Sequence, residues 1–327
     1  MKNFKGFCFF LFLLLGLKTL AIGQEEIIVR GNCKENNVKI SALAKNNGLV
    51  LRNLVVDLPL PLNSMEQEIT NIRKNGGKEV NEKSFSYIMF DYIGKTLQKA
   101  GSEIESYIQF TAKTYDIFVD FSKIKNIVPY DVNSEIYLKY ASKSNLPIID
   151  KDNPEIAKIA GEISKINPDI LNYAKACYEY VASKFRYLNP NTGLHPLSEL
   201  MKAGGGDCGN LSSIYISLLR HRGIPARHVV SLRADGTFHV WAEFYLEKIG
   251  WIPVDVTFKN LDNSGDYFGK LTGKNSGIIV NRDINLKLFC ENGKKCQVPL
   301  FQNFAYWYWF TSGKGKVDIE YSIKKIN

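Results

Sequence analysis

At 327 residues the chain is too long for a single small core, and we expect it to form two or three domains. Its formal net charge is +9, but the basic residues are scattered along the sequence and form no stripe interleaved with aromatic residues. Because nucleic-acid-binding surfaces concentrate their positive charge, the composition argues against a nucleic-acid partner.

Residues 1–23 have the parts of a secretory signal peptide: two early lysines, an apolar run, and a small-x-small cleavage signal before Gln24. The run is short for an uncleaved membrane anchor, which is the alternative. We therefore expect cleavage near Gly23, no stable membrane span in the mature protein, and a periplasmic or secreted location. Cleavage removes three lysines and lowers the formal charge from +9 to +6, an excess that suits a negatively charged envelope or acidic substrates.

Residues 24–150 show short alternating segments, such as 38–43 and 85–90, separated by Asn-Gly and Gly-Gly turn signals. Regularly spaced short strands of this kind predict an N-terminal all-β sandwich domain. The Leu-Pro-Leu-Pro segment at 58–61 belongs at a strand end or edge, because proline cannot donate to the hydrogen-bond ladder.

Two helices are predicted at about 155–165 and 169–185, each introduced by Asn-Pro and an acidic residue. In the second helix Cys177 falls on the apolar face, which predicts an inert core thiol.

Residues 204–210, with three glycines before Asp207, open a third helix that is read from 211–219 and ended by Gly223, which sets Cys208 in the first turn. At the first turn of a helix the unpaired backbone N–H groups and the positive end of the dipole stabilise a thiolate. The same N–H groups can hold an oxyanion. The alternative is a buried or disulfide-bonded cysteine on a flexible loop.

Strands are predicted at 224–230, 238–246 and 251–258, where apolar residues alternate with others. His239 and Asp255 lie on the face opposite to the apolar sets of their strands. A three-residue loop at 247–249 pairs residue 246 with 250, which places Asp255 diagonal to His239 at roughly 7–8 Å between backbones. The two side chains are then within reach of each other.

A cysteine, a histidine and an aspartate in this arrangement can carry out acyl transfer. A thiolate attacks an amide or ester carbonyl, an imidazole moves the proton to the leaving amine, and a carboxylate orients the imidazole. A thioester intermediate then passes its acyl group to water or to an amine.

In these motifs the chain resembles the transglutaminase-like superfamily. The segments that carry the resemblance are Gly206-Asp207-Cys208, Gly223-Ile224-Pro225-Ala226-Arg227, His239-Val240-Trp241 and Trp251-Ile252-Pro253-Val254-Asp255. The resemblance covers about residues 154–258. It implies an α+β fold with a papain-like core at 151–260, in which a helix bearing the nucleophile packs on an antiparallel sheet. It also implies the catalytic set Cys208, His239 and Asp255.

The segment around the nucleophile departs from the animal crosslinking members of that family. They carry Gly-Gln-Cys-Trp, whereas Gly-Asp-Cys-Gly stands here. Bacterial relatives with this looser pattern resemble peptidases or amidases. The second oxyanion donor has three candidates upstream of the nucleophile, namely Tyr187, Asn189 and His195.

Residues 261–327 are predicted to be a C-terminal β extension packed on the core. Cys290 and Cys296 flank an Asn-Gly turn, and a three-residue loop would place them directly opposite each other as a cross-strand disulfide. The aromatic run at 306–310 is either a ligand-facing wall or an internal strand. We favour the internal strand, because consecutive aromatic residues need burial on both faces.

No His-x-x-x-His or Cys-x-x-Cys spacing predicts a metal site, and the proposed chemistry requires no cofactor. The sequence therefore predicts an exported cysteine enzyme acting on amide bonds in peptides, proteins or peptidoglycan stems. The alternatives are a non-enzymatic envelope scaffold or binding module with the same fold, and a protein-crosslinking enzyme.

Overall fold

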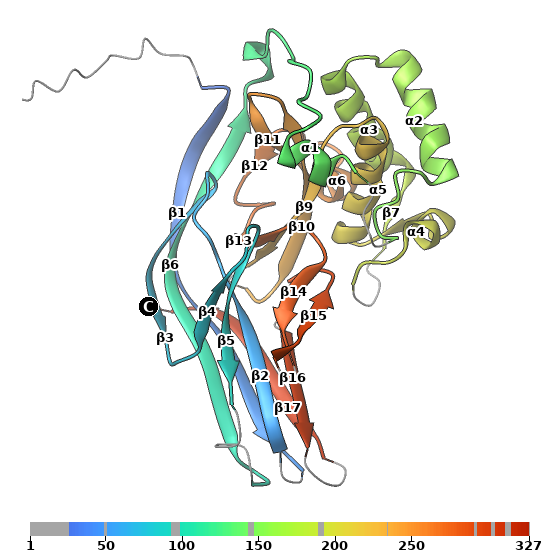
Figure 1. Cartoon of the computed structure of the whole chain (residues 1–327). Coiled ribbons are helices and arrows are strands. Elements are labelled where there is room, and N and C mark those ends of the chain that lie inside the picture. Colours follow the sequence, from blue (N-terminus) through green and yellow to red (C-terminus); the bar gives the residue numbers. More distant parts are fainter. Residues whose placement is uncertain are drawn as a thin grey trace, which may run out of the picture.

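The computed structural model describes residues 26–48, 51–92, 99–142, 147–188, 193–233, 235–290, 293–301, 305–310 and 315–326. The predicted signal peptide and Asn189 lie outside these ranges. The described part is mixed α+β, as expected, with a long β-sheet pair on one side and a helical cluster on the other (Figure 1). No helix in the described ranges is long and apolar enough to cross a membrane.

The sandwich consists of two antiparallel sheets. One has the order β12-β6-β1-β17, with β3 also paired to β6, and the other has the order β16-β2-β5-β4. Their inner faces share one buried cluster that includes Ile40 and Ile108 from the first sheet and Val56 and Ile88 from the second. The strands are β1 (Ile28–Asn46), β2 (Leu51–Leu60), β3 (Gln67–Lys74), β4 (Lys78–Asn81), β5 (Ser86–Asp91), β6 (Glu103–Val119), β12 (Lys270–Leu271), β16 (Ala305–Phe310) and β17 (Val317–Lys325).

A second four-stranded antiparallel sheet, in the order β11-β10-β9-β13, lies between the sandwich and the helices. Trp241 and Val229 on one face pack against Ile117 of β6, whereas the other face supports α5. Its strands are β9 (Ala226–Leu232), β10 (Phe238–Leu246), β11 (Gly250–Val254) and β13 (Ile278–Arg282).

The predicted start of α2 is confirmed, since Asn153 is its cap and Pro154 its first residue. The predicted start of α3 is wrong by two residues: Asp169, and not Asn167, is the cap, so Pro168 lies before the helix. Cys177 is fully buried on α3, and burial raises the pKa of its thiol to about 12, so the prediction of an inert core thiol is confirmed. The helices are η1 (Phe121–Lys123), α1 (Glu135–Tyr140), α2 (Pro154–Ile166), α3 (Ile170–Lys184), α4 (Leu197–Ala203), α5 (Cys208–His221) and α6 (Val256–Leu261).

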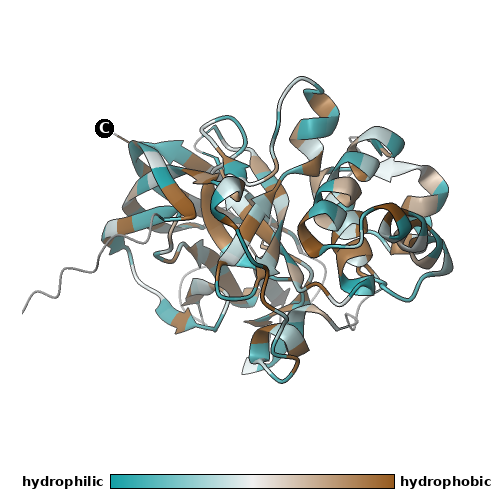
Figure 2. Ribbon diagram, turned by 90° about the horizontal axis from the view of Figure 1, so that it is seen from above, coloured by the Kyte–Doolittle hydropathy of each residue, from teal (hydrophilic) through white to brown (hydrophobic). Residues whose placement is uncertain are grey.

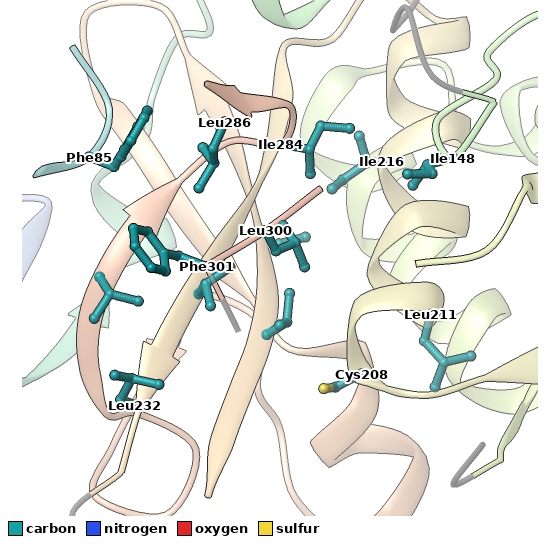
Figure 3. Close-up of a cluster of buried hydrophobic side chains, with 14 of the residues drawn as sticks. Phe85, Ile148, Cys208, Leu211, Ile216, Leu232, Ile284, Leu286, Leu300 and Phe301 are labelled. Carbon is teal, nitrogen blue, oxygen red and sulfur yellow. The ribbon is translucent and has the colours of Figure 1, made fainter. Parts of the chain in front are cut away.

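Viewed from above, the strands and helices carry hydrophobic segments where they face one another, and the outer loops are mainly hydrophilic (Figure 2). The buried cluster runs from the sandwich, through Phe301 and Leu232, to Leu211 and Ile216 on α5 (Figure 3). Cys208 lies at the edge of this cluster.

The prediction that residues 261–327 pack on the core is wrong for the last two strands, β16 and β17. β13 does pack on the core sheet, but β17 pairs with β1, from Val38 opposite Lys325 to Asn46 opposite Val317. β16 pairs with β2 of the other sheet. The end of the chain therefore completes the N-terminal sandwich, because the exposed edges of β1 and β2 offer unpaired backbone groups that these strands satisfy.

The aromatic run at 306–310 forms an edge strand and not the internal strand that was predicted. β16 stands at the end of its sheet, and Tyr306 and Tyr308 are 42% and 38% exposed. Tyrosine tolerates such a position because its hydroxyl group remains in contact with water.

Cys290 and Cys296 form a disulfide. The predicted register of their hairpin is wrong by two residues. β14 (Leu286–Phe289) and β15 (Lys295–Val298) pair Leu288 with Cys296, so Cys290 lies beyond the ladder, where its amide donates to the carbonyl of Lys294 at 2.7 Å.

Candidate active site

Cys208 is the first residue of α5 and is held there by a short parallel pair of strands. β8 (Gly205–Gly206) pairs with β7 (Arg186–Tyr187), and the carboxylate of Asp207 caps the helix by accepting from the amide of Asn210 at 3.0 Å. Gly205 has φ +159°, and a Cβ there would lie 2.0 Å from the carbonyl oxygen of Arg186. Only glycine fits, and it lets the nucleophile loop approach β7 closely.

His239 is the second residue of β10, and Asp255 directly follows the last residue of β11. The predicted register is confirmed, since Leu246 pairs with Gly250 and Ala242 with Val254. His239 Nε2 lies 2.7 Å from Asp255 Oδ2, and both side chains are almost completely buried.

The predicted strand at 251–258 is wrong beyond Val254. The chain turns there into α6, and Asp255 becomes the N-cap, with Oδ1 accepting from the amide of Phe258 at 3.0 Å. Aspartate favours caps because its side chain replaces the missing backbone acceptor. The cap leaves Oδ2 directed at the imidazole.

The side chain of Cys208 also interacts with the imidazole of His239. Burial by itself would lower the pKa of His239, but the charge and hydrogen bond of Asp255, together with the interaction with Cys208, raise it to about 9. These neighbours favour the positively charged imidazolium.

Asn275 is a further contact of this group that the sequence did not reveal. Its side chain is fully buried, and its amide donates to Asp255 Oδ2 at 3.3 Å and to the carbonyl of Lys270 at 3.2 Å. Its oxygen accepts from the amide of Thr272 at 2.9 Å. The segment reads as an ordinary polar turn, and no local signal shows that it folds back onto Asp255.

The three candidates for the second oxyanion donor lie in different surroundings. Tyr187 lies beside the nucleophile loop, where burial, and then the nearby charges of Cys208 and Asp207, raise its pKa. His195 instead donates its backbone amide to Asn210 at 2.9 Å, and its ring lies 3.7 Å from Glu199. Asn189 falls outside the described residues.

His228 has a structural position under α5. Burial lowers its pKa to about 3, and Nε2 lies 3.1 Å from the hydroxyl of Ser213 and 3.2 Å from the carbonyl of Gly209. It therefore supports the first turn of the helix as a neutral side chain. Across the described ranges no three His, Cys, Asp or Glu residues come together as a metal site would require.

The sequence model of the transglutaminase-like superfamily matches residues 157–256, the segment that contains Cys208, His239 and Asp255. Residues 157–256 are a transglutaminase-like domain. The family model ends one residue after Asp255, so the strands of the sandwich lie outside it.

Similarity beyond the transglutaminase-like domain extends through most of the chain. A crystal structure from Cytophaga hutchinsonii, described as a candidate cysteine protease, aligns with 92% of this chain and 93% of its own, at a TM-score of 0.58 and 12% identity. The two proteins share a fold. The periplasmic domain of TgpA from Pseudomonas aeruginosa aligns with 67% of this chain and 88% of its own, at a TM-score of 0.37 and 12% identity.

An uncharacterized protein of Haemophilus influenzae is 25% identical over 237 residues. The match covers 61% of this chain and 62% of that relative's length.

Proposed function

We propose that this protein is a cysteine-dependent enzyme that transfers acyl groups from amide bonds, with Cys208 as nucleophile, His239 as acid and base, and Asp255 as the residue that orients the imidazole. One observation carries the proposal. Cys208 at the N-terminus of α5 interacts with the imidazole of His239, whose Nε2 lies 2.7 Å from the buried carboxylate of Asp255. The description of the Cytophaga protein as a candidate cysteine protease supports the same chemistry.

The proposed reaction begins with the ion pair of thiolate and imidazolium. The sulfur attacks the carbonyl carbon, and the backbone N–H groups at the start of α5, together with Tyr187, receive the developing oxyanion. The imidazolium then protonates the amide nitrogen, the C–N bond breaks and the amine leaves. Water or a second amine attacks the thioester, His239 accepts its proton, and the thiolate leaves with the bonding electrons.

We propose peptides, proteins or peptidoglycan stems as substrates, and a periplasmic or secreted location. Gly-Asp-Cys-Gly at the nucleophile favours hydrolysis over protein crosslinking. The alternative, a scaffold that keeps the fold without chemistry, predicts an unreactive Cys208.

The test uses alkylation, which requires no knowledge of the substrate. Iodoacetamide is titrated against pH and the modified cysteines are located by mass spectrometry. Cys208 should still react at pH 6, well below the ~8.5 at which an ordinary thiol ionises, and His239→Ala should abolish that reactivity. Cys33, which is free and exposed, is the control within the same molecule.

Amide cleavage is then followed by mass spectrometry on a panel of peptides and stem peptides. Cys208→Ala should lose at least ~10³-fold in rate, and Cys33→Ala should retain the wild-type rate. A Cys208 that alkylates no faster than Cys33 at pH 6, or a Cys208→Ala variant that keeps its activity, would overturn the proposal in favour of the scaffold.

A further inference from the structure

A cleft of about 260 Å³ lies beside the candidate active site, and we refer to it as the basic cleft. It is bounded by the end of β9, the loop after β12 and strands β1, β6 and β17 of the sandwich. Its charged lining residues are Lys34, Arg233, Asp235, Lys274 and Lys325. Three larger pockets, of about 280, 520 and 730 Å³, are lined by other residues and do not include this loop.

The charge of the basic cleft is unbalanced. Asp235 is its one acidic lining residue, and its carboxylate accepts from the amide of Thr237 at 3.0 Å and from the Thr237 hydroxyl at 2.6 Å. Lys34, Lys274 and Lys325 form no salt bridge with any residue that the structure describes. Asp235 interacts electrostatically with Arg233, and Asp262 with Lys274, but four basic lining residues against one acidic one leave the lining with a net positive charge. A cleft with net positive charge concentrates anions.

The residues that line the basic cleft are linked to His239 and Asp255 through Phe258 and Asn275. The guanidinium of Arg233 lies 5.7 Å from the ring centre of Phe258, and that ring stands edge-on to His239 at 5.1 Å. The same loop supplies Asn275, which donates to Asp255. The guanidinium is thus at most about 11 Å from the imidazole, a span of about three residues of extended peptide.

Hydrogen bonds from Arg233 hold the loop after β12 that lines the basic cleft. Arg233 donates from Nε to the carbonyl of Ser276 at 3.4 Å and from Nη2 to the carbonyl of Lys274. Gly277 packs against β9, since a Cβ there would lie 2.8 Å from the carbonyl oxygen of Leu232. The guanidinium of Arg233 and the loop backbone are therefore held in place beside the site, which lowers the ordering cost of binding.

We propose that the basic cleft is a subsite for a carboxylate of the substrate, located about three residues from the amide that Cys208 attacks. This inference rests on the proposed function and names its substrate class: peptides with an acidic side chain or a free carboxyl terminus near the reacting bond. The volume is below the ~300–1,000 Å³ of sites that enclose a whole small molecule, and it suits a single acidic group.

The first experiment measures binding to the Cys208→Ala protein, so that no turnover is needed. Fluorescent hexapeptides are compared in pairs that differ only in Glu against Gln, with the variable residue three positions before or after the central amide. We expect the better Glu peptide to bind about tenfold more tightly than its Gln partner at low ionic strength, and added salt to reduce the preference.

The charges are then removed by Lys274→Gln with Lys325→Gln, both exposed positions. The preference should fall at least threefold. A matched double variant, Lys83→Gln with Lys287→Gln, removes the same charge from the separate pocket of about 520 Å³ and should leave the preference unchanged. Equal affinities for Glu and Gln peptides, including no binding of either at about 1 mM, would overturn the subsite.

A second measurement compares alkylation of wild-type Cys208 by iodoacetate, which is anionic, and iodoacetamide, which is neutral. The ratio of the two rates should fall in the Lys274→Gln, Lys325→Gln variant and not in the control. An unchanged ratio would count against the subsite even if the enzyme is active. If no amide is cleaved but the Glu preference follows these lysines, the proposed function fails and the subsite stands.

Discussion

The raised pKa of His239 comes from its buried neighbours, and only 6% of the residue is exposed. The carboxylate of Asp255, 2.7 Å away, outweighs the cost of burying the imidazolium. The proposed mechanism needs this charged form to protonate the leaving amine. Activity should therefore decline as pH rises through about 9, where the imidazolium loses its proton.

Asn275 holds the carboxylate that maintains this charge, and Asn275→Ala removes the hydrogen bond to Asp255 Oδ2. The carboxylate can then move away from the imidazole, which lowers the pKa of His239. We expect kcat to fall ~10–100-fold, as for other residues that orient a catalytic group, and the alkaline limb of the pH profile to move below 9. Steady-state kinetics from pH 6 to 10 measure both effects. A reduced kcat with an unmoved limb would show that Asn275 acts only on the fold.

Asp57 is a buried carboxyl group, and neither of its oxygens has a hydrogen-bond partner among the residues that the structure describes. Burial raises its pKa to about 8. The unfolded chain loses this proton near pH 4 and the folded protein near pH 8, so the free energy of unfolding should fall steadily as pH rises between these values.

The variant Asp57→Asn cannot ionise, and its stability should lack this component of the pH dependence. Urea unfolding at pH 5, 6 and 7 measures the difference between variant and wild type. We expect the free energy of unfolding of the variant, relative to that of the wild type, to rise with each unit of pH. Parallel curves would mean that Asp57 is already charged in the folded protein.

At the scale of elements, the pairing of β7 with β8 positions the nucleophile. Gly205→Ala would place a methyl group 2.0 Å from the carbonyl oxygen of Arg186, and the loop would have to shift. We expect a loss of roughly 1–3 kcal/mol in stability and a slower alkylation of Cys208.

Thermal unfolding and the rate of iodoacetamide labelling test this change. Gly161→Ala in α2 is the matched control, because no atom lies within 4 Å of the added methyl group and alanine favours a helix over glycine by ~1 kcal/mol. Normal labelling of Cys208 in Gly205→Ala would show that the pairing is dispensable.

Elements with strong local signals were predictable from the sequence. Asn153 and Pro154 specified the start of α2, and the three-residue loop specified the register of β10 and β11. The prediction failed at Val256, where alternating apolar residues also fit the buried face of a short helix. The helix forms because the carboxylate of Asp255 caps it at the amide of Phe258, while the second oxygen of Asp255 contacts the imidazole.

At the scale of the whole molecule, the chain ends by closing the sandwich that it began. Removing residues 302–327 would take β16 and β17 away and leave the edges of β1 and β2 unpaired. Since β17 also covers the buried Ile40 and Ala42, we expect the truncated protein to unfold or aggregate.

Circular dichroism and size-exclusion chromatography test the truncation, with removal of residues 326–327 as the control. A truncated chain with the wild-type melting temperature would restore the interpretation of residues 305–325 as an accessory extension.

The transglutaminase-like domain could be recognised from the sequence because its signals are short-range. Cys208, His239 and Asp255 are each placed by a cap, an alternation or a turn within ten residues of them. The tertiary structure decided what depends on distant segments: the contact of Asn275 with Asp255, the pairing of Val38 with Lys325, and the basic cleft. Those contacts arise when the two sheets of the sandwich, the sheet beside them and the helices bury their apolar faces together, and burial of that kind leaves no pattern in any one stretch of sequence.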